Sequence, residues 1–216
     1  MRAHRWVTVV GLSCLVIVGG LAGPASAATF RIDPSRSSLV VQIFRDGVAA
    51  RLGHDHVVEA TTVSGSVTYD ATAPALSSVA AQVQTATLRA DGSETRRRFG
   101  LEGQPSTSDV AEIEKSMKAE GQLDASRFPT ISFASTTITP EAPDRYQVAG
   151  QLTIRGVTRA VQFPANVVME GNVFRATATL TFMQSAFGYK PYSALLGAIK
   201  NKDAVVLHID LVAVPE

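Results

Sequence analysis

The sequence predicts an all-β fold, an antiparallel barrel of about eight strands with one main α-helix and a short helical loop near the C-terminus. Between Arg127 and Pro164, apolar and polar residues alternate in three successive segments, as in strands with one apolar face. Their connections are too short for a parallel crossover, so we expect antiparallel neighbours. After residue 27 the chain has no cysteine, and a closed sheet without free edges would hold it together without disulfides.

The first 27 residues are typical of a secretory signal peptide. Arg2 and Arg5 precede an apolar run over 7–22, and 24–27 end in small residues, so we expect cleavage after Ala27. An uncleaved membrane anchor is the alternative, but the apolar run is short for a span of about 20 residues. We therefore expect two parts, a signal peptide over 1–27 and one barrel domain over 28–216, in a periplasmic or secreted protein.

The charge of the chain gives no reason to expect nucleic acid as a partner. Lys and Arg total 20 against 19 Asp and Glu, and loss of Arg2 and Arg5 with the signal peptide keeps the balance close to neutral. A nucleic-acid-binding protein normally carries a marked excess of basic residues.

Nine segments after residue 27 have strand character. If two of them form one bent strand, they fit a barrel of about eight strands. The expected segments are residues 29–33, 37–45, 57–69, 77–88, 130–138, 146–154, 159–169, 173–183 and 204–214.

One helix is expected between the fourth and fifth of these segments. Asp109 can cap it, Glu112 follows three residues later, and Gly121 can end it. Val110, Ile113 and Met117 form one narrow apolar stripe. The helix should therefore lie on the barrel, over one end.

Two long connections differ in character. The first contains Arg96-Arg97-Arg98, which we interpret as a solvated loop; a phosphate-binding cluster is the alternative. The second, 184–203, is rich in aromatic and aliphatic residues, and Ser193 can cap a short helical turn over 194–200. Exposed apolar residues on a loop usually cover a cavity or contact a partner.

The segment Gly53-His54-Asp55-His56 raises the question of a metal site. In an extended chain His54 and His56 point the same way, as chelating His-x-His pairs do, and His208, Asp55 or Glu59 would have to complete a Zn or Cu site. His208 lies opposite the more apolar row of its strand and should face outward, so we favour a polar turn without metal. The sequence contains no familiar nucleophile or phosphate-loop motif, and we expect no catalytic residues, no enzyme activity and no cofactor.

The apolar rows of the strands could fill a dry core or surround a ligand. The inward rows include small residues among large ones, which favours a cavity: Ala81, Gly150, Ala176 and Ala178. Strand parity and loop aromatics give the residues expected to line it. They are Val41, Ile43, Phe133, Leu152, Ile154, Phe163, Phe174, Leu180 and Phe182, with Met117, Phe187, Tyr189 and Tyr192 near an entrance.

The order of several short motifs resembles the YceI-like family of exported, lipocalin-like bacterial proteins that bind polyisoprenoids or other lipids. The motifs are Phe30-Arg31-Ile32-Asp33-Pro34, the strand after Gly65, Arg127-Phe128-Pro129-Thr130-Ile131-Ser132-Phe133, and Gly150-x-Leu152-Thr153-Ile154-Arg155-Gly156-Val157-Thr158. Two features depart from the family pattern: Ser185-Ala186 precedes Phe187-Gly188 where many members have an acidic residue, and the His54-Asp55-His56 motif is not universal.

The resemblance implies a lipocalin-like barrel that holds an extended apolar tail in an elongated pore. The expected ligand is a polyisoprenoid, quinone-like or fatty-acyl lipid, held for sequestration or transport. The expected partners are this small hydrophobic ligand and, for lipid exchange, a transient contact with a membrane or a membrane protein. The oligomeric state is left open.

Overall fold

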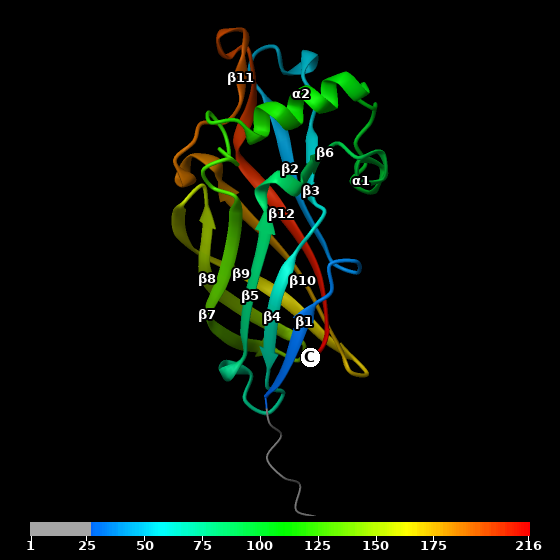
Figure 1. The fold of residues 1–216 in the computed structure, drawn as a ribbon, viewed down its shortest axis with the longest axis vertical. Helices are drawn as coiled ribbons and strands as arrows, with labels where there is room; N and C mark the ends of the chain where they lie inside the picture. Colours follow the sequence, from blue (N-terminus) through cyan, green and yellow to red (C-terminus); the bar gives the residue numbers. More distant parts are fainter. Residues whose placement is uncertain (1–26) are drawn as a thin grey trace, which may run out of the picture.

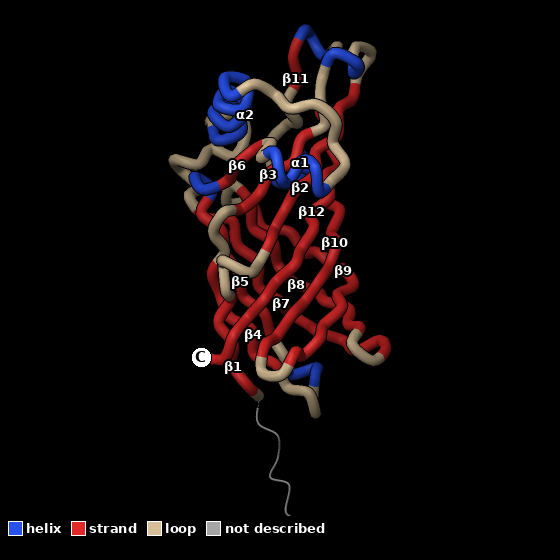
Figure 2. The backbone as a smooth tube through the Cα atoms, turned by 90° about the vertical axis from the view of Figure 1, so that its right-hand side faces the viewer, coloured by secondary structure: helices blue, strands red, loops and turns tan. Residues whose placement is uncertain are grey.

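The computed structural model describes residues 27–216, so the expected signal peptide, apart from Ala27, lies outside the described residues. The fold is an antiparallel barrel with both α-helices near one end (Figures 1 and 2). Its strands are β1 (Ala28–Ile32), β2 (Ser38–Asp46), β3 (His56–Ala60), β4 (Ser64–Tyr69), β5 (Ser78–Gln84), β6 (Leu88–Ala90), β7 (Thr130–Ala142), β8 (Arg145–Ile154), β9 (Val157–Glu170), β10 (Val173–Met183), β11 (Ser193–Ala194) and β12 (Ile199–Pro215). The α-helices are α1 (Ser93–Arg98) and α2 (Thr107–Lys118), and short 3₁₀ turns cover Ala50–Leu52, Pro74–Leu76, Thr85–Thr87, Gln184–Phe187 and Leu195–Gly197.

Eight strands close the barrel in the order β1, β4, β5, β7, β8, β9, β10, β12 and back to β1. The long strand β12 pairs with β10 on one side and with β2 and then β1 on the other. Between β1 and β2, the backbone N–H of Asp33 donates to the carbonyl of Val212 over 2.8 Å, and the Val212 N–H donates to Ser37 Oγ over 3.0 Å. Through these contacts the segment between β1 and β2 stays hydrogen-bonded to β12, so β1 and β2 act as one bent strand. The prediction of an eight-stranded barrel is confirmed.

Two of the predicted strands are each divided into two strands in the structure, so their predicted bounds are wrong. Segment 57–69 is divided into β3 and β4, and segment 77–88 is divided into β5 and β6. The divisions arise because β4 and β5 belong to the closed ring, whereas β3 and β6 continue the sheet beyond β2. At the second division the buried side chain of Thr85 donates to the carbonyl of Phe128 over 2.8 Å, which holds the bend against the start of β7.

Helix α2 lies across the barrel near β2, β3 and β6 (Figure 1). Ser106 caps it, not Asp109: the Ser106 side chain accepts from the Asp109 N–H, and the Asp109 carboxylate accepts from the Ser106 N–H. Asp109 is therefore the third helical residue of a capping box. Glu114 fastens the helix to the sheet, because its Oε1 accepts from the backbone N–H of Ala90 over 3.1 Å.

The arginine run is not the solvated loop that was predicted. It forms the end of α1, which packs on the outer face of β3, with Thr95 Oγ1 donating to Glu59 Oε2 over 2.8 Å. Arg97 and Arg98 are exposed, but Arg96 is buried. The 184–203 connection also differs from expectation, since Ser193 lies in β11 and the helical turn is Leu195–Gly197 without a side-chain cap.

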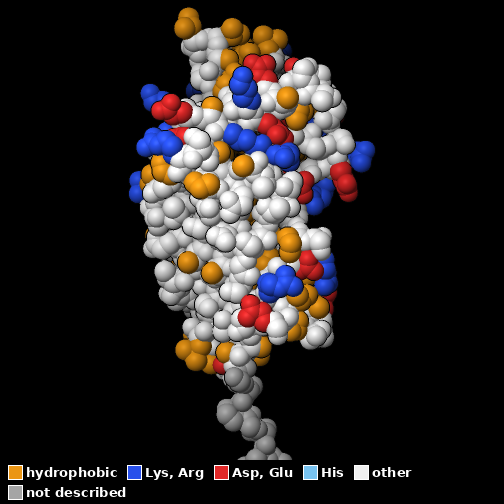
Figure 3. Space-filling model, in the orientation of Figure 1, with side chains coloured by type: hydrophobic (Ala, Val, Ile, Leu, Met, Phe, Trp, Pro, Cys, Tyr) orange, Lys and Arg blue, Asp and Glu red, His pale blue; other side chains and the backbone are white. Residues whose placement is uncertain are grey.

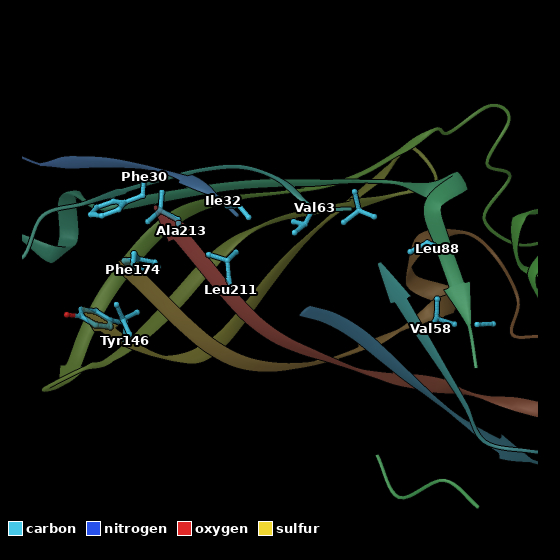
Figure 4. Packing of buried hydrophobic residues seen from close by; sticks show 13 residues of the cluster. Phe30, Ile32, Val58, Val63, Leu88, Tyr146, Phe174, Leu211 and Ala213 are labelled. Atoms are coloured by element: carbon cyan, nitrogen blue, oxygen red, sulfur yellow. The ribbon is translucent and has the colours of Figure 1, made fainter. Parts of the chain in front are cut away.

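Aromatic side chains fill the end of the barrel that is remote from α2. The ring of Phe174 lies 5.9 Å from Phe30 and 5.5 Å from Tyr69, and the Tyr69 and Tyr146 hydroxyls are 3.3 Å apart. Figure 4 shows Phe30, Phe174 and Tyr146 together in this part of the interior, away from Val58 and Leu88. Burial, and then the hydrogen bond with Tyr69, raises the pKa of Tyr146 to about 12, as expected for a phenol held in a dry core.

Candidate ligand cavity

A cavity of about 480 Å³ lies between α2 and the inner faces of the strands. Its volume falls in the range of about 300 to 1,000 Å³ that is typical of small-molecule sites. Most of the wall is hydrocarbon. The apolar residues are Leu39, Val41, Ile43, Val58, Ala60, Val83, Leu88, Ile131, Leu152, Ile154, Phe182, Val205 and Leu207 from the strands and their ends, with Ile113, Met117 and Leu123 on and after α2.

Polar side chains also line the cavity, and none of them among residues 27–216 is a lysine or an arginine. They are His56, Asp109, Glu112, Ser116, Gln122, Gln184, Tyr189, Tyr192 and Asn201. Asp109 and Glu112 are exposed residues of α2, whereas Gln184 is buried. Burial raises the pKa of Tyr189, which keeps its hydroxyl neutral at physiological pH. The cavity therefore combines an apolar wall with a set of polar groups whose only fixed charges are negative.

His56 is fixed by a buried ion pair behind the cavity wall. Its Nδ1 lies 2.6 Å from Asp91 Oδ2, and Asp91 Oδ1 accepts from Arg96 Nη1 over 2.7 Å and from the Val57 N–H over 3.2 Å. The Arg96 side chain also donates to three backbone carbonyls, those of Asp55, Glu102 and Gly103. Burial alone would raise the pKa of Asp91, but the hydrogen bonds from His56 and Arg96 outweigh it and lower that pKa.

Eight of the thirteen predicted lipid-contact residues line the cavity: Val41, Ile43, Met117, Leu152, Ile154, Phe182, Tyr189 and Tyr192. The other five lie in the packed interior. Phe133, Phe163, Leu180 and Phe187 pack with cavity residues such as Leu152 and Ile154, whereas Phe174 lies at the end of the barrel remote from α2. Phe133 and Phe163 pack against each other at 5.7 Å, and Phe187 packs edge-on against Phe182 at 5.5 Å. Contact between any of the thirteen and a lipid stays a prediction.

In the sequence, the small inward residues favour open space for a ligand, but at Gly150 the structure shows that this space is filled. A Cβ on Gly150 would meet ring atoms of Phe133 at 2.5 Å, so the space above this glycine is filled by an aromatic ring. None of Ala81, Gly150, Ala176 and Ala178 lines the cavity. The cavity lies instead beside α2, between Ile113 and Met117 and the strand residues that face them.

The three histidines of the described chain, His54, His56 and His208, are not brought together as metal ligands. His54 is exposed, His56 is engaged by Asp91, and His208 is on the opposite face of the sheet, where its Nε2 lies 2.7 Å from Gln42 Oε1 and its ring 4.8 Å from the ring of Phe99. Within residues 27–216 no group of three His, Cys, Asp or Glu side chains is placed to hold a metal ion. The favoured interpretation of His208 as outward-facing agrees with its place in the structure.

Several wall residues were absent from the predicted set. The alternation of β12 already distinguished Val205 and Leu207 from the outward His208, and strand parity likewise marked Ile131. No pattern in the sequence pointed to the pairing of His56 with Asp91, because 35 residues separate them.

The fold and the cavity together define a closed antiparallel barrel of the lipocalin-like kind with an internal apolar site. The chain belongs to the YceI-like family, whose domain matches residues 30–213. A UPF0312 protein of Shewanella putrefaciens is 30% identical over 189 residues, covering 83% of this chain and 86% of that protein. A UPF0312 protein of Shewanella sp. (strain W3-18-1) is 28% identical over 199 residues, covering 88% and 89%.

Two solved structures share the barrel at low sequence identity. BcnA of Burkholderia cenocepacia superposes with a TM-score of 0.63 at 19% identity, covering 84% of this chain and 99% of BcnA. A YCEI protein of Campylobacter jejuni superposes with a TM-score of 0.56 at 13% identity, covering 74% and 84%. These similarities confirm the predicted fold class. In the part of the chain that the structure describes, no helix is long and apolar enough to cross a membrane.

Proposed function

We propose that this protein binds the apolar tail of a long-chain lipid in its cavity, for sequestration or transport. The observation that carries the proposal is the cavity itself, which is walled by hydrocarbon side chains beneath α2. Each CH₂ group moved from water into such a wall contributes about 0.8 kcal/mol, so a long tail binds with few polar contacts. A polyisoprenoid, a quinone-like or a fatty-acyl tail fits this chemistry, and the role is binding rather than catalysis.

The experiment is organic extraction of protein purified from its native compartment, followed by mass spectrometry. We expect a long-chain lipid in amounts comparable with the protein, and we expect the delipidated protein to take up added long-chain lipids. Repeated absence of any lipid, together with no uptake of added lipid, would overturn the proposal.

We also propose that the protein acts outside the cytoplasm after removal of residues 1–27. The support is the arrangement of basic, apolar and small residues in this segment. Cell fractionation and amino-terminal sequencing test it. The mature chain should begin at Ala28 in the exported fraction, and a protein that keeps residues 1–27 in the cytoplasm would contradict it.

For lipid exchange we propose that an apolar tip beside the cavity docks on a lipid surface. We define the tip as Val48 and Leu52 of the β2–β3 loop and Leu195 and Leu196 of the β11–β12 hairpin. Their exposures are 98%, 72%, 66% and 110%, respectively. The two loops lie side by side, since the Ala49 N–H donates to the Ala198 carbonyl over 2.9 Å. Figure 3 shows apolar side chains gathered at the end of the molecule that carries β11.

The position and charge of the tip favour a lipid surface as its partner. Tyr192 lines the cavity and is also 45% exposed, so it connects the cavity with the hairpin. Exposed Arg51 adjoins Leu52 in the same loop and suits an anionic bilayer. A lipid leaving the bilayer at this tip would reach the cavity after a short path.

A further inference from the structure

The imidazole ring of His56 lies between Asp91 and the cavity. One edge of the ring binds Asp91, and the opposite edge faces the cavity. The Nδ1 edge is bound to Asp91, whose side chain is fully buried, and Asp91 is bound in turn to Arg96, whose side chain is 3% exposed. His56 itself lines the cavity. An imidazole fixed in this way cannot turn freely, so Nε2, on the far side of the ring from Asp91, is left for the cavity.

The hydrogen bonds around Asp91 determine which His56 nitrogen carries the proton. The carboxylate accepts from Arg96 and from the Val57 N–H, and its lowered pKa keeps it ionised, so it acts only as an acceptor. Nδ1 of His56 must therefore donate to it. In the neutral ring Nε2 is then an acceptor, and among the described residues it has no hydrogen-bond partner.

The charged groups around the cavity are also poor partners for an anion. Asp109 and Glu112 are carboxylates, and no lysine or arginine from the described chain lines the cavity. The amide nitrogen of Gln184 donates one of its two protons to the Lys202 carbonyl over 2.9 Å, and its oxygen can accept a hydrogen bond. A phosphate or carboxylate brought here would meet two carboxylates and no basic side chain to balance its charge, although the hydroxyls of Ser116, Tyr189 and Tyr192 can donate to it. An uncharged donor avoids this repulsion and finds acceptors in the same set.

We propose that His56 anchors the head of the bound lipid by accepting a hydrogen bond at Nε2, and that this head is an uncharged donor, of which a long-chain alcohol is the simplest. Asp91 and Arg96 are positioning residues that set the orientation and tautomer of His56. The proposal rests on the proposed lipid binding and adds the chemical class of the head. It also gives the His56 end of the His54-Asp55-His56 motif a role other than metal binding.

The test compares three ligands with one tail and different heads: geranylgeraniol, geranylgeranyl phosphate and geranylgeranyl acetate, which has no donor. Dissociation constants are measured for the delipidated full-length mature protein and for two variants. His56→Asn retains an amide that can donate to Asp91 but lacks the atom that faces the cavity. His54→Asn changes the exposed histidine two residues earlier and is the matched control.

We expect the unchanged protein to bind the alcohol about 3- to 10-fold more tightly than the acetate, as one hydrogen bond would give, and more tightly than the phosphate. His56→Asn should remove the preference for alcohol over acetate and leave acetate binding unchanged, while His54→Asn should alter neither. Thermal unfolding of both variants shows whether the fold is retained.

Equal binding of all three ligands, tighter binding of the phosphate, or an unchanged preference in His56→Asn would overturn the role of His56 while leaving lipid binding in place. Failure of all three ligands to bind would instead count against the proposed function. If His56→Asn does not fold, the comparison of ligands on the unchanged protein still decides between a donor head and an anionic one.

Discussion

The ring of Phe133 lies over Gly150, so close that a Cβ on Gly150 would come within 2.5 Å of two ring atoms and 2.6 Å of the Ala134 carbonyl oxygen. The glycine thus allows an aromatic side chain from β7 to lie flat against β8. Phe133 then packs on Phe163 of β9. This contact fills one part of the barrel interior and sets one limit of the cavity.

Replacement of Gly150 by alanine should therefore destabilise the protein. The added methyl group must displace the Phe133 ring and the Ala134 carbonyl, and overpacking of this kind costs about 1 to 3 kcal/mol in the free energy of unfolding. Urea unfolding measures the change. Gly121→Ala is the matched control, because a Cβ there meets nothing within 4 Å, and it should change stability little. Equal effects of the two substitutions would show that the Phe133 ring is not fixed by Gly150.

The same contact shows what strand parity can and cannot predict. Phe133 and Leu152 are directly paired across β7 and β8, and alternation placed both side chains inside. Leu152 lines the cavity, whereas Phe133 belongs to the packed interior. Leu152 and Phe133 differ because the Phe133 ring turns toward Gly150, and because the cavity lies beside α2, which comes from another part of the chain. The sequence could therefore predict the barrel and its inner face, but not where that face is empty.

Arg96 illustrates a second limit. Three consecutive arginines suggested a solvated segment, yet on a helix consecutive residues point in different directions, and the one that faces the barrel depends on where the helix docks. Arg96 faces inward because its guanidinium donates hydrogen bonds to Asp91 and to three backbone carbonyls. No sequence pattern linked these partners, Asp55, Asp91, Glu102 and Gly103, to Arg96.

Asp91→Asn should destabilise the protein strongly. The substitution leaves the Arg96 guanidinium buried without its counter-charge, and breaking a buried pair in this way costs about 3 to 5 kcal/mol in the free energy of unfolding. Asp210→Asn removes the partner of Arg175 in an exposed pair and should cost at most about 1 kcal/mol. Urea unfolding of both variants at neutral pH provides the comparison, and similar costs would contradict the role assigned to Asp91.

Acid should remove the contribution of Asp91. Its pKa in the folded protein is below the usual 3.8, so its ionised form stabilises the fold above pH 3.8, and this contribution is lost as the pH falls through the lower folded value. Unfolding followed as a function of pH should show a shallower acid loss for Asp91→Asn than for the unchanged protein. Parallel acid curves would show that Asp91 does not titrate differently in the folded and unfolded states.

His208 should make the protein less stable in mild acid. Burial, and then the charge of Arg98, lowers the pKa of His208 below the usual 6.5, so the unfolded chain takes up a proton at higher pH than the folded protein does. Stability should therefore fall as the pH drops through about 6.5. His208→Gln, which retains a polar side chain beside Gln42, should weaken this dependence, measured by chemical unfolding from about pH 8 to about pH 5. An unchanged pH dependence would show that His208 does not contribute to it.

The apolar tip should control binding to vesicles. Leu195 and Leu196 have φ angles of 48° and 54°, and asparagine tolerates this backbone conformation, so replacing both with Asn removes the apolar side chains while favouring the same turn. Co-sedimentation with vesicles containing phosphatidylglycerol, and the rate of lipid transfer to them, should both fall. The control replaces Val168 and Met169, exposed apolar residues of β9, with Asn. Equal loss in both variants, or in neither, would contradict a specific role of the tip.

The central claim is that lipid occupies the cavity beneath α2, and native mass spectrometry of one matched pair of variants tests it most directly. Val41→Trp places a large ring in the cavity, whereas Val168→Trp adds the same ring to the exposed outer face of β9. We predict a lipid-sized mass excess on the unchanged protein and on Val168→Trp, and its loss from folded Val41→Trp. A mass excess of the same size on all three proteins would contradict the claim, because the lipid would then be bound elsewhere.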